Sequence, residues 1–134
     1  MTLQVQLVSP ERVMWSGEAE MVTTRTVEGG DITFLDGHTS FIGALEIGRV
    51  VIRPADGPDV EFAVHGGFVE VSDNFVSVLS DISEGPEQID VARATRARDA
   101  ARDAVGKDAS DKDAAAALRR AELRLSVSGA SASD

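Results

Sequence analysis

Residues 60–71, with the sequence VEFAVHGGFVEV, contain the pattern that decides the fold. Apolar side chains at positions 60, 62 and 64 alternate with residues 61 and 63, and valines at positions 69 and 71 flank a glutamate. A period of two is typical of a strand that buries one face. His65 precedes the pair Gly66-Gly67, where we expect the first run to end. The stretch therefore predicts two short strands.

The same alternation continues on both sides of this stretch. Leu3, Val5 and Leu7 alternate with glutamines, valines at positions 76 and 78 flank a serine, and short β-branched runs lie at residues 21–24 and 50–52. Turn-forming pairs separate the runs: Gly29-Gly30, Asp36-Gly37, Asp56-Gly57 and Asp73-Asn74. Many short strands with frequent turns indicate an antiparallel sandwich or barrel.

The period changes after Gly85-Pro86, where the chain becomes rich in Ala, Arg and Asp. Asp90 is a suitable N-cap for a first helix, which should end over residues 106–109. Ser110 is expected to start a second helix, and the short connection favours an antiparallel hairpin. The apolar stripes of both helices are mostly alanine, which gives weak cohesion because burial scales with apolar area. We therefore expect a detachable hairpin, although a permanently docked one fits the same pattern.

Charge divides the chain at the same place. The net charge is −10; residues 1–88 hold four basic and fifteen acidic side chains, whereas residues 89–134 hold nine basic and eight acidic ones. An acidic body argues against nucleic-acid binding, which needs basic surface. We predict a mainly β sandwich domain over residues 1–88 and a two-helix hairpin over residues 89–134, with residues 126–134 frayed.

Signatures of catalysis are missing from the sequence. There is no cysteine, no Gly-x-Ser-x-Gly elbow and no phosphate loop around either lysine. His38 lies in a predicted turn and His65 at a predicted strand end, and two isolated histidines are too few for a transition-metal site. No run approaches the roughly 20 apolar residues that span a bilayer. The sequence predicts a soluble, non-catalytic protein without a metal and without membrane insertion.

Arginines are the remaining candidates for ligand binding. Arg93 and Arg96 lie three residues apart on the first predicted helix, and Arg120 and Arg124 share a face of the second. Four guanidinium groups on adjacent helices can clamp a phosphate chain. They can equally pair with an acidic partner or be solvated, and spacing alone favours solvated charge.

Several motifs together resemble the epsilon subunits of F-type ATP synthases. They follow in the family's order over nearly the whole chain: LVSPER at residues 7–12, SGE at 16–18, EGG at 28–30, FLDGH at 34–38, FAVHGGFVEV at 62–71 and VSVL at 76–79. Asp36 stands where the family usually has proline, and Thr39-Ser40 replaces a common Ala-Pro.

The resemblance implies a flattened β-sandwich followed by a helical hairpin, in a peripheral rotor-stalk subunit on the cytoplasmic face of the cell membrane. The sandwich would bind the gamma subunit and the ring of c subunits, and so couple proton transport to ATP synthesis. The extended hairpin would reach the alpha/beta catalytic head and inhibit ATP hydrolysis. The resemblance assigns the ring contacts to Asp31, Asp36 and His38.

In some members of this family the folded hairpin binds a regulatory ATP through an Ile/Leu-Asp-x-x-Arg-Ala pattern and arginines of the second helix. The resemblance assigns this site to six residues here: Ile89, Asp90, Arg93, Ala94, Arg120 and Arg124. No cofactor is required. Two alternatives remain from the residues alone, namely a free-standing ligand-binding sandwich and a small hydrolase that uses acidic side chains.

Overall fold

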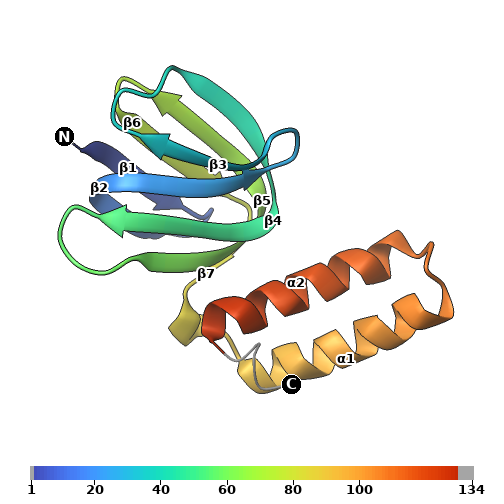
Figure 1. Cartoon of the computed structure of the whole chain (residues 1–134). Helices are drawn as coiled ribbons and strands as arrows, with labels where there is room; N and C mark the ends of the chain where they lie inside the picture. The colour runs from blue at the N-terminus through green and yellow to red at the C-terminus, as the bar shows by residue number, and fades with distance from the viewer. Residues whose placement is uncertain (1, 130–134) are drawn as a thin grey trace. The chain divides into compact units, whose positions relative to one another are not determined.

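The computed structural model describes residues 2–129 and divides the chain into two compact units, with the division between Ser83 and Glu84. The change in composition that marks the predicted boundary comes slightly later, after residue 88. The strands lie in the first unit, and the helices α1 and α2 lie in the second (Figure 1). The predicted mainly β domain followed by a two-helix hairpin is confirmed.

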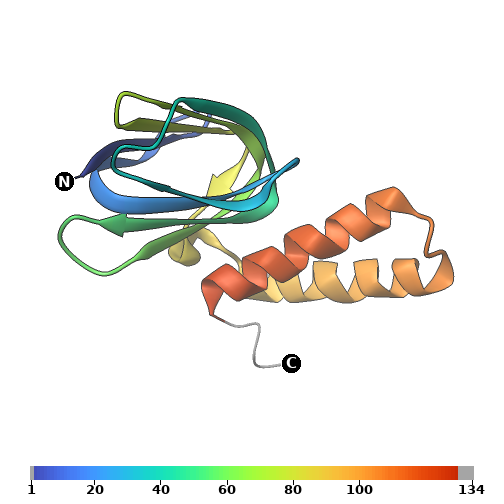
Figure 2. The same ribbon diagram turned by 45° about the horizontal axis from the view of Figure 1, so that its top comes forward.

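Seven strands are present within residues 2–129. Their bounds are β1 Leu3–Val8, β2 Val13–Thr26, β3 Gly30–Leu35, β4 Phe41–Pro54, β5 Val60–Ser72, β6 Phe75–Ser80 and β7 Ser83–Glu84. The sheet runs in the order β1-β6-β5-β4-β2-β3, with β7 paired to β5 and β1 also paired to β2. The β1–β2 pairing closes five strands into a ring, and Figure 2 shows the strands curved around a common interior.

One pairing departs from the expected antiparallel arrangement. β1 pairs with β2 antiparallel but with β6 parallel, in a register that joins Gln4 to Phe75 and Val8 to Leu79. A tight turn between consecutive strands forces them to be antiparallel, but β1 and β6 are far apart in the sequence. The expected antiparallel sandwich or barrel is therefore corrected for this one strand pair, which is parallel.

Three strands are longer than the sequence pattern indicates. β2 and β4 each span 14 residues and β5 spans 13. The register of β2 against β4 shifts between Ala19 and Met21 and again between Thr23 and Thr26. Such bulges bend a strand and raise its twist, so β2 and β4 follow the curved wall as long strands where only short runs at residues 21–24 and 50–52 were expected.

β5 also continues through Gly66-Gly67, which corrects the prediction that a strand ends at His65. Both glycines have positive φ, and a Cβ on Gly67 would lie 2.1 Å from the carbonyl oxygen of Leu79. Only glycine adopts this backbone conformation readily and leaves room for β6 at that distance. The glycine pair bends β5 without interrupting it.

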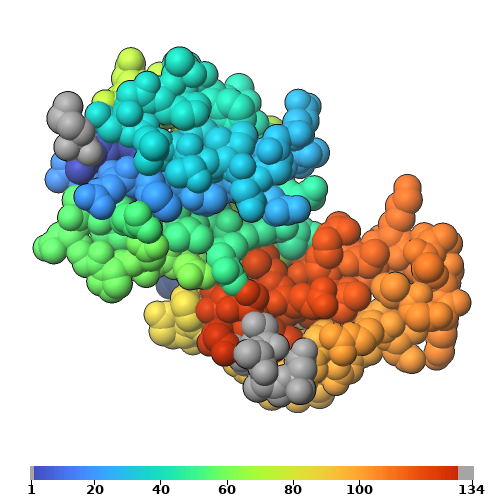
Figure 3. All heavy atoms as spheres, viewed as in Figure 1, coloured from blue at the N-terminus to red at the C-terminus, as the bar shows by residue number. Residues whose placement is uncertain are grey.

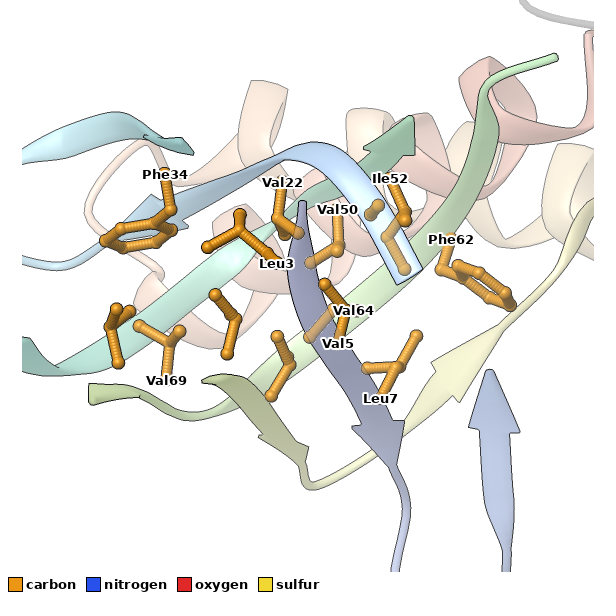
Figure 4. Packing of buried hydrophobic residues seen from close by; sticks show 14 of the residues in the cluster. Leu3, Val5, Leu7, Val22, Phe34, Val50, Ile52, Phe62, Val64 and Val69 are labelled. Carbon is orange, nitrogen blue, oxygen red and sulfur yellow. The ribbon is translucent and has the colours of Figure 1, made fainter. Parts of the chain in front are cut away.

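The core of the first unit is aliphatic, as the scarcity of aromatic residues predicts. Figure 4 shows side chains from β1, β2, β4 and β5 converging, with Phe34 and Phe62 at opposite ends of the group. The alternating residues Leu3, Val5 and Leu7 are fully buried. Figure 3 shows that side chains fill the space between the strands on the face in view.

The second unit begins with the single turn η1, Pro86–Gln88, followed by α1, Val91–Lys107, and α2, Lys112–Ser128. Asp90 caps α1, as predicted. Asp111 and not Ser110 caps α2: its carboxylate accepts from the amide of Ala114 at 3.0 Å, whereas Ser110 bonds to Asp108. The described residues show no helix long and apolar enough to cross a membrane.

The second helix is longer than expected at its end. Residues 126–128, which the sequence analysis assigned to a frayed tail, are helical, and Gly129 ends the helix in the left-handed conformation. Leu125 and Val127 are buried, so the last turn has apolar contacts. The rest of the predicted tail, residues 130–134, lies outside the described residues.

Candidate functional site

Small side chains form the seam of the hairpin. Ala94 and Ala101 of α1 and Ala114 and Ala121 of α2 are buried, and each pair is spaced by seven residues, or two helical turns. Alanines at this spacing let two helix axes approach closely but bury little apolar area. Among the described residues of α2, Leu125 is the largest buried aliphatic side chain.

A cavity of about 320 Å³ lies at the open end of the hairpin. This volume is at the lower end of the range for small-molecule sites. The segment before α1, the first two turns of α1 and the last turns of α2 line it through Glu84, Gln88, Asp90, Arg93, Ala94, Ala97 and Arg124. All seven residues belong to the second unit.

Four of the six residues assigned to an ATP site line this cavity: Asp90, Arg93, Ala94 and Arg124. Ile89 is buried beside it, and its amide donates to the carbonyl of Pro86. Arg120 is not among the lining residues because four residues of helix displace it about 6 Å along α2 from Arg124. Arg96, which the spacing argument grouped with Arg93, is exposed outside the cavity.

Hydrogen bonds hold the polar wall of the cavity in place. An oxygen of the Asp90 carboxylate accepts from the amide of Arg93 at 3.0 Å, which caps α1. The Gln88 side chain accepts from the amide of Gly85 at 2.8 Å and so fixes η1. Arg124 Nε donates to Glu84 Oε1 at 2.7 Å.

Glu84 and Gln88 are functional candidates that sequence reasoning missed. Glu84 and Arg124 are 40 residues apart, so no local spacing connects them. The lining side chains contribute two carboxylates and two guanidinium groups, which leaves the cavity without net formal charge. It combines hydrogen-bond donors for an anion with acceptors for N–H or O–H groups.

The residues assigned to ring contact do not form one cluster. Asp36 and His38 lie together in the β3–β4 turn, whereas Asp31 lies near the start of β3 and pairs with Arg25 at 3.3 Å. Five residues of extended strand separate Asp31 from Asp36 by about 16 Å. The structure therefore brings two of the three together.

Asn74 fixes the β3–β4 turn from a distant part of the sequence. Its side chain donates to Asp36 at 2.7 Å and accepts from the amide of Gly37 at 2.8 Å. Beside this turn, the His38 ring packs edge-on against Phe34 with the centroids 4.8 Å apart. The turn is held by both polar and aromatic contacts.

A row of apolar side chains crosses the outside of the sheet over five strands. The pairing places Ala44 beside Phe68, Phe68 beside Leu79, Leu79 beside Val8, and Val8 beside Val13. Phe68, Leu79 and Val13 are 56%, 48% and 52% exposed. We call these five residues the outer row. Exposed apolar residues this continuous usually mark an interaction surface.

Carboxylates border the outer row. Glu70 lies two residues from Phe68 on the same face of β5, and the Asp81 carboxylate lies over Gly66, 2.9 Å from where a Cβ would stand. Within residues 2–129, no group of three or more His, Cys, Asp or Glu side chains is arranged to hold a metal ion.

Comparison with known proteins decides the family. The model of the family described as "ATP synthase, Delta/Epsilon chain, beta-sandwich domain" matches residues 2–86. The ATP synthase epsilon chain of Streptomyces griseus is 46% identical over 123 residues, which are 92% of this chain and 92% of that one. The chain belongs to the ATP synthase epsilon family. It is therefore a non-catalytic subunit of ATP synthase and not an enzyme by itself.

Other similarities agree with this membership. The epsilon chain of Thermobifida fusca is 42% identical over 127 residues, 92% of this chain and 89% of that one. A chain in the mitochondrial ATP synthase structure of Euglena gracilis shares the fold, with a TM-score of 0.71 and 21% identity over 98% of this chain and 80% of that chain. Membership of the epsilon family decides against both the free-standing binding module and the small hydrolase.

Proposed function

We propose that this epsilon-family chain is a central-stalk subunit that couples rotation to ATP synthesis and restrains ATP hydrolysis through its hairpin. The observation that carries the proposal is the extent of the similarity: identity to epsilon chains runs over 92% of the sequence and therefore includes the hairpin. The Euglena structure contains F1 and a c-ring, and a Tetrahymena thermophila structure of the central stalk and c-ring has a TM-score of 0.55. We place the subunit on the cytoplasmic face of the cell membrane.

The outer row is the surface we assign to the gamma subunit. Apolar side chains on five adjacent strands offer a continuous apolar surface, and the carboxylates of Glu70 and Asp81 border it. A matching partner surface has an apolar centre flanked by basic side chains, because opposite charges raise the rate and specificity of association. The acidic excess of residues 1–88 supports the same partner chemistry.

Contact with the c-ring is assigned to the β3–β4 turn. Asn74 and Phe34 hold Asp36 and His38 in a defined conformation, which lowers the entropy cost of docking. Asp31 belongs to this assignment only if the ring also covers the opposite end of β3. The turn is polar, so its contacts with the ring are hydrogen bonds and ion pairs.

Inhibition through the alpha/beta catalytic head is assigned to the hairpin. Its alanine seam buries little apolar area, so separation of its two helices costs little free energy. The arginines on both helices give an extended hairpin cationic groups for acidic segments of the head. Regulatory ATP is assigned to the cavity lined by Asp90, Arg93, Ala94 and Arg124, with Ile89 behind it and Arg120 one turn away.

Binding to an epsilon-depleted complex that contains gamma tests the surface assignment. Phe68→Ser and Leu79→Ser should each weaken binding about tenfold or more, as expected for central interface residues. Val27→Ser is the matched control, because Val27 is equally exposed but lies outside the outer row. All three variants should unfold at similar temperatures. If all three variants bind the complex equally well, the gamma subunit contacts a face of the sheet other than the outer row.

Calorimetric titration of the full chain with ATP tests the nucleotide assignment. Arg93→Ala should weaken binding because Arg93 lines the cavity, whereas Arg96→Ala removes the same charge outside it. Equal affinities of the two variants for ATP would show that ATP does not bind in this cavity.

A further inference from the structure

The sequence contains two Asp-Gly pairs, Asp36-Gly37 and Asp56-Gly57. Such a pair can rearrange without an enzyme, because glycine has no side chain to shield its amide nitrogen from the neighbouring carboxyl group. The nitrogen attacks Cγ of the aspartate, water leaves, and a cyclic succinimide forms. Water then opens the ring, mostly at the main-chain carbonyl, and leaves isoaspartate, in which the main chain runs through the former side chain. Because one water leaves and one returns, the reaction needs no further reactant.

Asn74 holds both reacting groups of the first pair. Its side-chain nitrogen donates to Oδ1 of Asp36 at 2.7 Å, and its side-chain oxygen accepts from the Gly37 amide at 2.8 Å. The turn is also closed by the backbone, because the His38 amide donates to the Leu35 carbonyl at 3.0 Å. The carboxamide thus bridges the two groups that would have to meet, and its hydrogen bonds must open before the Gly37 nitrogen reaches the Asp36 carboxyl group.

The second pair lies in the loop between β4 and β5 (Figure 1). Asp56 and Gly57 are both exposed, and a Cβ on Gly57 would meet no atom within 4 Å. Within residues 2–129, neither residue makes a hydrogen bond or an ion pair. The reacting groups of this pair are therefore accessible to each other and to water.

Contacts at the base of this loop confine the free segment to its tip. Arg53 Nε donates to Asp59 Oδ1 at 3.0 Å, and the Ala55 amide donates to the carbonyl of Glu18 at 3.0 Å. These contacts flank the Asp-Gly pair without involving it. The tip can therefore take up an extra methylene group in the main chain while the paired strands stay in register.

We propose that Asp56-Gly57 is a site of spontaneous isoaspartate formation, and that Asn74 protects Asp36-Gly37 from the same reaction. The two pairs have the same chemistry, so their difference in rate comes from their surroundings. Two side-chain hydrogen bonds must open at Asp36, and each net hydrogen bond shifts an opening equilibrium severalfold. In the folded chain, Asp56 should therefore react about tenfold or more faster than Asp36.

Incubation of the full chain at one mildly acidic pH, in water enriched in heavy oxygen, tests the proposal. Ring opening adds one heavy oxygen atom, so mass spectrometry after digestion in ordinary water measures each site separately. The denatured chain is the control, because the two rates should agree within about threefold once the folded contacts are lost. Equal rates in the folded chain would overturn the proposal, and so would a difference that persists after denaturation. Absence of product at Asp56, in a time that converts the denatured chain, would overturn it too.

Asp36→Asn and Asp56→Asn form a matched pair that keeps the shape of the side chain. Asparagine closes the same ring with loss of ammonia, and hydrolysis then leaves a carboxylate, so the mass of the intact chain reports the reaction. In Asp36→Asn the side-chain oxygen still accepts from Asn74, so this variant should lose ammonia about tenfold or more slowly than Asp56→Asn. Similar rates for the two variants would refute protection by the turn.

Asn74→Ala tests the protecting residue itself. In this variant the reaction at Asp36 should approach the rate in the denatured chain to within about threefold, because both side-chain hydrogen bonds are lost. The rate at Asp56 should not change, which shows that the chain remains folded and that the effect is local. An unchanged rate at Asp36 would refute the role of Asn74.

Discussion

Replacement of Asp90 by alanine should loosen the start of α1 and leave the sandwich unaffected. An oxygen of the Asp90 carboxylate accepts from the amide of Arg93 at 3.0 Å, and this is the side-chain cap of α1. A helix start has four amides without helical partners, so loss of this acceptor exposes one of them. The backbone bond from the amide of Ala94 to the Asp90 carbonyl survives the substitution.

The size of the effect follows from the geometry. Replacing an N-cap Asp by Ala costs about 1 kcal/mol, within a usual range of about 0.5–2 kcal/mol. Asp90 is exposed, so no further cost for a buried unpaired group is added. A change of about 1 kcal/mol corresponds to a roughly fivefold change in an equilibrium constant, and local opening of the first turn should increase by that factor.

Hydrogen exchange of the Arg93 and Ala94 amides measures this opening. Asp90→Ala should exchange about fivefold faster there, while amides of the core strands keep their protection. Asp90→Ser is the control, because serine also caps helices but lacks the carboxylate. Rates in Asp90→Ala that equal those of the parent chain would refute the capping argument. Fast exchange in Asp90→Ser as well would show that the charge, and not the hydrogen bond, stabilises the turn.

Three further outcomes follow from the same structure. Gly67→Ala should lower the free energy of unfolding by at least about 2 kcal/mol, measured by denaturant titration, because it places a methyl group against β6 at positive φ. Asn74→Ala should cost about 1–2 kcal/mol in the same titration, because it removes both the acceptor for the Gly37 amide and the donor to the Asp36 carboxylate. Hydrogen bonds from Ser110 lower the pKa of Asp108 below its usual 3.8, so this carboxylate stabilises the helix connection above that pH and the contribution disappears as pH falls through the lowered pKa. Carbon-detected titration of Asp108 should show that shift, and Ser110→Ala should move the pKa upward.

Local pattern predicted part of the core, although Ala63, on the face opposite Phe62 and Val64, is buried as well. Period-two alternation identified Leu3, Val5, Leu7, Val69 and Val71 as inward-facing, and all five are buried. Alternation of apolar and polar residues indicates which face of a strand is buried. In this fold the buried face is the one that points into the closed sheet. The same reasoning identified Asp90 as a cap, because capping depends on neighbouring residues only.

Features set by distant parts of the chain were not predictable in this way. Gly66-Gly67 reads locally as a break, yet β6 lies so close to Gly67 that glycine is needed inside a continuous strand. The parallel partner of β1 is likewise fixed by closure of the sheet. At the end of α2, Ser126 and Ser128 look like a tail, but burial of the intervening Val127 keeps the turn helical.

In the candidate site too, residues close in sequence could be predicted and residues far apart in sequence could not. Asp90, Arg93 and Ala94 are close in sequence and line one cavity, so a motif can identify them. Glu84 and Arg124 meet only because the hairpin folds back on itself, and no spacing rule connects them. Arg120 shares a helix face with Arg124 but lies one turn too far along α2 to reach the cavity.

The most direct test measures ATP hydrolysis by an epsilon-depleted catalytic sector after addition of the full chain or of residues 1–88. The truncated chain retains the whole cluster of core residues and the segment matched by the sandwich family. The account predicts that both bind, that the full chain suppresses hydrolysis, and that residues 1–88 do not. Equal suppression by both chains would contradict the role of the hairpin, and failure of both to bind would contradict the coupling function.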